Sequence, residues 1–105
     1  MDFREMAENL DLEEDDFMEL IALFVESGIS DLGKLESAFE MGNTEDAANA
    51  AHSLKGAAVN LGLMDIHAMA DKLEVDARDG RLGESVTSVQ ILRAALDKVS
   101  GMIKG

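Results

Sequence analysis

The sequence predicts an all-α protein, an antiparallel four-helix bundle with a short N-terminal helix that caps one end. The 105 residues include no proline, and the only aromatic side chains are four Phe, whereas the strong helix formers Ala, Leu, Met and Glu are common. Hydrophobic residues make up 47% of the chain, enough to build a core. They recur three and four positions apart along most of its length, which is the helical period. The length fits one domain, residues 1–105.

The first two helices follow from this spacing. Residues 2–10 carry apolar side chains three and four apart, which predicts the short first helix. From about residue 13 to Met41 one apolar phase continues without a break, which predicts a single long helix. Gly28 and Gly33 lie inside it, where each costs about 1 kcal/mol relative to Ala and could bend the helix.

Three more amphipathic helices are expected after Met41. Asn43 or Thr44 is the expected N-cap of the third helix, which ends at Gly62. The fourth is expected over 64–78, and the fifth over 84–103. Because the connections between the four long helices are short, neighbouring helices should run antiparallel and pack as a bundle.

The charge balance disfavours several classes of partner. The net charge is −13, from 22 acidic and 9 basic residues. A chain so poor in clustered Lys and Arg is a poor binder of nucleic acid or of an anionic membrane surface. The absence of cysteine excludes disulfides and thiolate metal sites. The N-terminal "MDFREMAENL" lacks the pattern of a secretion leader, and no apolar run is long enough to span a bilayer, so we expect a cytoplasmic protein.

One side of the third helix does not look like an ordinary solvent face. Its apolar stripe consists of Ala47, Ala51, Leu54, Ala58 and Leu61. At 100° per residue His52 lies about 140° from the centre of that stripe. The residues around it are Ala48, Lys55, Gly56 and Val59, mostly small or apolar where long polar side chains are usual. This pattern favours a partner that approaches His52 closely.

Gly56 and Lys55 each allow two interpretations. A glycine in mid-helix costs about 1 kcal/mol relative to Ala, so Gly56 suggests that a partner must come close; the alternative is a crossing helix or mere tolerance. An exposed imidazole ordinarily titrates near pH 6.5, so part of it is neutral and nucleophilic at neutral pH. Beside it the Lys55 ammonium would offset the charge of a phosphoryl group, or it is simply a solvated surface lysine.

The run "HSLKGAA", from His52 to Ala58, continues to Asn60, Leu61 and Gly62 and resembles the signature of histidine-containing phosphotransfer (HPt) domains. The order of helices over most of the chain is similar to the layout of that family. The resemblance implies that His52 accepts a phosphoryl group from the aspartate of a response-regulator receiver domain and passes it to another receiver. It further implies that Lys55 steadies the phosphoryl oxygens.

The resemblance also implies the partners and cofactors. The partners would be response-regulator receiver domains, with a hybrid histidine kinase as a further candidate, docking over Ala48, Gly56, Val59 and Asn60. Such a domain has no nucleotide site, metal or cofactor of its own and is not a stand-alone kinase. The Mg²⁺ used in transfer would be held by the receiver.

Other functions remain open at this point. One is a phosphoacceptor domain charged directly by the catalytic domain of a chemotaxis-type kinase, and another is a helical adaptor without phosphate chemistry. A metal-binding bundle is disfavoured because no Glu-x-x-His pair is present. A hydrolase with His52 as general base is disfavoured because no carboxylate lies within one turn to orient the ring. His67 has no Lys-Gly companion and is expected to be a surface bystander.

Overall fold

The computed structural model describes residues 2–104, apart from the side chains of Glu84 and Lys104, and this part of the chain is almost entirely helical. The helices are α1 (Phe3–Asn9), α2 (Glu14–Met41), α3 (Thr44–Asn60), α4 (Met64–Arg78) and α5 (Val86–Lys104), and the 3-10 turn η1 (Leu82–Ser85) precedes α5. The predicted all-α class is confirmed, and each helix lies within two residues of its expected bounds. Among the described residues, no helix combines the length and apolar character that crossing a bilayer needs.

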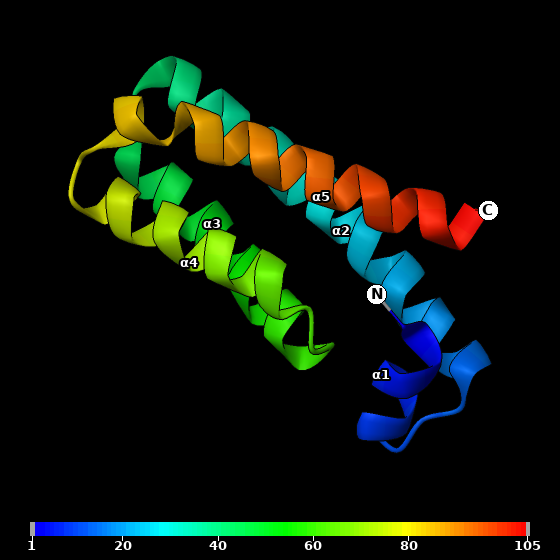
Figure 1. Ribbon diagram of the computed structural model, residues 1–105. Coiled ribbons are helices and arrows are strands. Elements are labelled where there is room, and N and C mark those ends of the chain that lie inside the picture. The colour runs from blue at the N-terminus through cyan, green and yellow to red at the C-terminus, as the bar shows by residue number, and fades with distance from the viewer. Residues whose placement is uncertain (1, 105) are drawn as a thin grey trace.

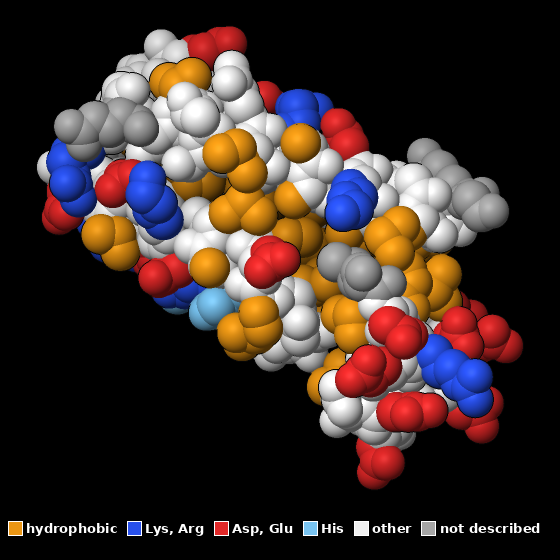
Figure 2. Space-filling model, viewed as in Figure 1, with side chains coloured by type: hydrophobic (Ala, Val, Ile, Leu, Met, Phe, Trp, Pro, Cys, Tyr) orange, Lys and Arg blue, Asp and Glu red, His pale blue; other side chains and the backbone are white. Residues whose placement is uncertain are grey.

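The four long helices run alternately up and down (Figure 1). At a rise of 1.5 Å per residue, the 28 residues of α2 span about 42 Å, which matches the 42 Å longest dimension of the molecule. Helix α1 folds back at the start of α2, where the rings of Phe3 and Phe17 lie 6.0 Å apart. Figure 2 shows acidic side chains crowded at this end of the molecule.

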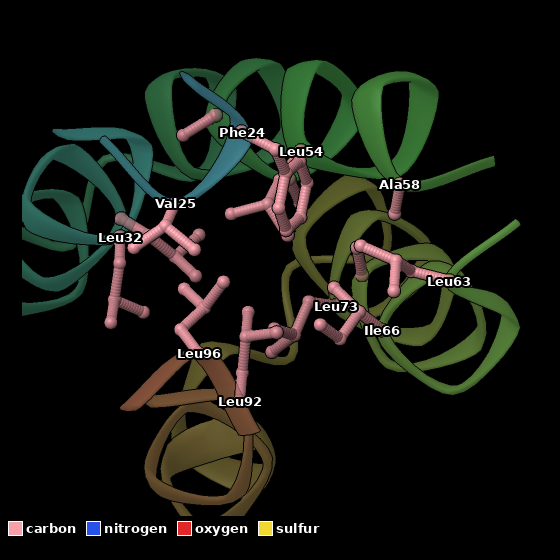
Figure 3. Packing of buried hydrophobic residues seen from close by; sticks show 14 of the residues in the cluster. Phe24, Val25, Leu32, Leu54, Ala58, Leu63, Ile66, Leu73, Leu92 and Leu96 are labelled. Carbon is pink, nitrogen blue, oxygen red and sulfur yellow. The ribbon is translucent and has the colours of Figure 1, made fainter. Parts of the chain in front are cut away.

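The core is built from aliphatic side chains and Phe. Leu54 of α3, Leu73 of α4 and Leu92 of α5 are each at most 1% exposed, and side chains from α2, α3, α4 and α5 point toward one another in the centre of the bundle (Figure 3). Alanine occupies much of the buried face of α3. Because alanine is small, the neighbouring helices can lie close to α3.

The two glycines inside α2 have different surroundings, and the helix continues through both. A Cβ added to Gly28 would lie 3.2 Å from Cδ2 of Leu96, so the glycine lets α5 pack closely on α2. A Cβ added to Gly33 would meet nothing within 4 Å. Gly28 therefore has a packing role that Gly33 lacks.

Polar side chains determine where α3 and α5 begin. Asn43 is the N-cap of α3: its side-chain oxygen accepts a 3.0 Å hydrogen bond from the Asp46 backbone N–H. At the other corner Ser85 is fully buried and donates a 2.7 Å hydrogen bond to Oδ2 of Asp76. Arg81 pairs with the second oxygen of Asp76 at 3.3 Å. The buried Asp76 carboxylate thus ties the start of α5 to α4.

Candidate functional site

His52 lies near the middle of α3 on the side turned away from the core. The side chain is 64% exposed, whereas Ala51 and Leu54 on the opposite side are buried. The position that helical phase predicts for the imidazole is therefore confirmed. What the spacing along α3 does not reveal is the group that holds the ring.

Glu74 of α4 holds the imidazole ring. Nδ1 of His52 lies 3.1 Å from Oε2 and 3.3 Å from Oε1 of this carboxylate. An ionised carboxylate can only accept hydrogen bonds, so Nδ1 must carry the proton that is shared with it. In the neutral ring Nε2 then carries the lone pair. The contact thus selects the tautomer that leaves Nε2 as the nucleophile.

The same carboxylate accepts hydrogen bonds from two cations. Nζ of Lys55 lies 2.6 Å from Oε1, and Nη2 and Nε of Arg78 lie 2.7 and 3.1 Å from Oε2. Glu74 is only 6% exposed. Burial alone would raise its pKa, but the hydrogen bonds from Lys55, Arg78 and His52 lower the pKa to about 2. Glu74 is therefore an anion at neutral pH.

Lys55 is not a freely solvated lysine. Its side chain is 24% exposed and lies in the contact between α3 and α4, with Nζ also 3.4 Å from Oδ1 of Asp71. Hydrogen bonding to Glu74 raises the pKa of the Lys55 ammonium despite some desolvation. Its positive charge is therefore permanent near neutral pH, and it is held one helical turn from His52.

The surface that continues from His52 along α3 is open. A Cβ added to Gly56 would meet nothing within 4 Å, so no helix crosses α3 there, and that alternative explanation of the glycine is wrong. Val59 is 43% exposed, and Asn60, the last residue of α3, is exposed as well. Three of the four predicted docking positions therefore lie on accessible surface.

Two expectations from the sequence are wrong. Ala48 is 2% exposed and cannot contribute to a docking surface. The reason is that α3 packs against two helices: Ser53 donates a 2.9 Å hydrogen bond to Asp31 of α2, while α4 covers the opposite side. The buried arc of α3 is therefore wider than one apolar stripe. His67 is half-buried rather than a surface bystander, and its Nδ1 lies 3.3 Å from the Lys55 carbonyl oxygen.

Sequence reasoning missed Glu74 and Arg78. A weak signal exists, because the two residues are four apart in "LEVDAR" and so share one face of α4. Nothing in that pattern indicates that the face meets His52. The described residues bring no three His, Asp or Glu side chains together in an arrangement that could hold a metal ion.

The fold and the site together define a class of protein: an up-and-down helical bundle that presents one oriented, exposed histidine beside two cations. The family model for the Hpt domain matches residues 19–101, and the chain belongs to this family. Membership gives it a phosphotransfer role in two-component signalling, in which Hpt domains exchange phosphoryl groups with receiver domains and kinases.

A solved structure is similar over nearly the whole chain. It is the crystal structure of histidine-containing phosphotransfer protein B (HptB) from Pseudomonas aeruginosa PAO1. The likeness has a TM-score of 0.85 at 26% sequence identity and covers 99% of this chain and 90% of that one. A search of curated proteins gives no significant match.

Proposed function

We propose that His52 is the phosphoacceptor of a relay, which receives a phosphoryl group from the aspartyl phosphate of one receiver domain and passes it to the aspartate of another. One observation carries the proposal: an exposed imidazole whose Nδ1 is bonded to a buried carboxylate. A ring held in this way presents its free nitrogen to solvent, where a partner can reach it.

The transfer step makes use of the Glu74 contact. The lone pair of Nε2 attacks phosphorus, the N–P bond forms, and the P–O bond to the receiver aspartate breaks and releases a carboxylate. Because the ring keeps its Nδ1 proton, it gains positive charge as the bond forms. The Glu74 carboxylate, 3.1 Å from Nδ1, stabilises that charge. Transfer to the second receiver reverses the same steps.

Lys55 and Arg78 supply the charge that the phosphoryl group needs. Both bind Glu74 beside His52. A phosphoryl group adds close to two negative charges beside them, and Lys55 is the cation that we expect to turn toward its oxygens. The protein then works mainly by positioning and electrostatics. It needs no cofactor of its own, since the receiver brings the Mg²⁺.

Gly56, Val59 and Asn60 form the surface on which the receiver docks. They follow His52 toward the C-terminal end of α3 and are accessible. The lack of a side chain at Gly56 lets a loop of the receiver come within contact distance of the helix backbone, so that its aspartyl phosphate can reach the ring.

A labelling experiment tests the site. The protein is incubated with a receiver domain that has been charged by a small radiolabelled phosphodonor, and acid-labile, alkali-stable label is measured. We expect label on the wild type and on His67→Gln, and none on His52→Gln. His67→Gln is the matched control because it removes the other histidine of the chain.

Two outcomes would contradict the proposal. Label that persists on His52→Gln would show that His52 is not the phosphoacceptor. Label that appears only with a kinase catalytic domain and ATP, and with none of a panel of receivers, would favour the direct kinase route.

A further inference from the structure

An apolar groove lies between α4 and α5, on the face of the bundle seen in Figure 2. Its volume is about 420 Å³, within the range of pockets that bind ligands. Met6 of α1 lines one end, Met64 and Met69 line the α4 wall, and Ala95 and Val99 line the α5 wall. The groove is thus bounded by three helices and runs between two of them.

This groove is separate from the phosphotransfer site. Met69 and Glu74 lie about 140° apart around α4. Glu74 faces α3 and His52, whereas Met69 faces α5. A molecule bound in the groove would therefore leave His52 accessible. Methionine side chains are flexible and polarisable, so a groove lined by three of them can adapt to the shape of an apolar partner.

Acidic side chains crowd the α1 end of the groove, while the lining itself carries one acid, Asp65, and one base, Lys98. Residues 2–16, which form α1 and the start of α2, contain eight acidic side chains and a single basic one, Arg4. Arg4 lies 3.8 Å from Glu8 and is thus already close to an acid. In Figure 2 the red acidic side chains border the orange apolar ones at this end. An apolar surface beside a dense negative field suits a partner that is both apolar and cationic.

We propose that this groove binds an amphipathic helix, whose apolar face lies between α4 and α5 and whose Lys and Arg side chains lie over residues 2–16. A small apolar ligand would make no use of the acids. A second copy of this chain would bring another net charge of −13 and be repelled, as would an anionic membrane. Lys98 lines the α5 wall, so the cationic side chains of the partner should lie over the acidic residues 2–16 and away from that wall.

Designed peptides test the chemistry of the partner. The probe is a fluorescent Leu/Lys peptide of about 18 residues, or five helical turns, with all Leu on one face. Fluorescence anisotropy measures its binding to the wild-type chain. We expect the Leu/Lys helix to bind at least about tenfold tighter than a scrambled peptide of the same composition, a difference of about 1.4 kcal/mol. A Leu/Glu helix of the same pattern should not bind.

A pair of variants separates groove binding from simple charge attraction. Met64→Glu and Val75→Glu each place one negative charge at an exposed apolar position of α4, 55% and 47% exposed. Only Met64 lines the groove. Met64→Glu should weaken peptide binding at least about tenfold, while Val75→Glu should leave it within about twofold. Circular dichroism checks that both variants remain helical.

Equal effects of the two variants on peptide binding, or binding of the Leu/Glu helix, would overturn the proposal that the groove binds a cationic amphipathic helix. Loss of all binding at high salt, with no preference for the ordered peptide over the scrambled one, would show adhesion to the acidic surface only and would overturn it too. His52→Gln should bind the peptide as the wild type does. The outcome of the peptide-binding experiment is therefore independent of whether His52 is the phosphoacceptor.

Discussion

Replacing Glu74 by Gln removes the one negative charge that holds His52, Lys55 and Arg78 together while keeping the shape of the side chain. The carboxylate is 6% exposed and accepts hydrogen bonds from all three. An amide has one oxygen to offer and places an NH₂ group against donors. We therefore expect Glu74→Gln to lower the free energy of unfolding in a way that depends on pH.

The size of the effect follows from the pKa of Glu74. The folded protein lowers this pKa from the usual 4.5 to about 2. A difference of that size is worth roughly 3 kcal/mol at neutral pH, because each tenfold change in an acid constant is worth about 1.4 kcal/mol. Since the folded pKa is the lower one, this stability is fully present above pH 4.5. It falls to about half near pH 3 and is lost below about pH 2.

The assay is urea unfolding followed by circular dichroism, for the wild type and Glu74→Gln, at several pH values from 2.5 to 7. The difference in unfolding free energy should shrink as the pH falls. Glu40→Gln, at an exposed position of α2, is the matched control for loss of one negative charge. It should change stability by no more than about 0.5 kcal/mol throughout. A Glu74→Gln difference that stays constant from pH 7 to pH 2.5 would refute the reasoning.

Three further predictions concern packing, capping and the phosphorylated state. Gly28→Val should destabilise the fold by about 1–3 kcal/mol because the added side chain would press on Leu96. Gly33→Ala, where an added Cβ meets nothing, should stabilise the fold by up to about 1 kcal/mol. Thermal unfolding of the two variants measures both effects. Asn43→Ala should cost about 1 kcal/mol in the same assay through loss of the cap on α3. Lys55→Met should shorten the lifetime of phosphorylated His52 even in a Glu74→Gln background, as measured by loss of label; no further shortening there would mean that Lys55 acts only through Glu74.

The helices could be predicted because each depends on its own residues. Spacing of apolar side chains determines which face of a helix is buried, and the N-cap Asn43 and the left-handed Gly62 determine where α3 begins and ends. The exposure of His52 follows from the same local phase. These features require no knowledge of where the other helices lie.

Contacts between helices could not be predicted from the sequence in the same way. That Glu74 meets His52 depends on how α4 is rotated and shifted against α3, which is decided by the packing of the whole core. The burial of Ala48 has the same origin, because it depends on how much of α3 the neighbouring helices cover. Periodicity locates the centre of a buried face but not its edges, and Ala48 lies at an edge.

The carboxylate that orients His52 belongs to Glu74 on α4 and not to α3, and this has a physical consequence for the site. On α3 itself the positions one turn from His52 are not equivalent: Ala48 is buried, and a carboxylate in place of Gly56 would occupy open surface that a partner needs. Glu74 instead reaches the ring from the adjacent helix, where it is buried and paired with two cations. The ring is thus held through Nδ1, and the surface beyond it stays open. In this bundle, contact from a second helix orients the histidine and still leaves it accessible.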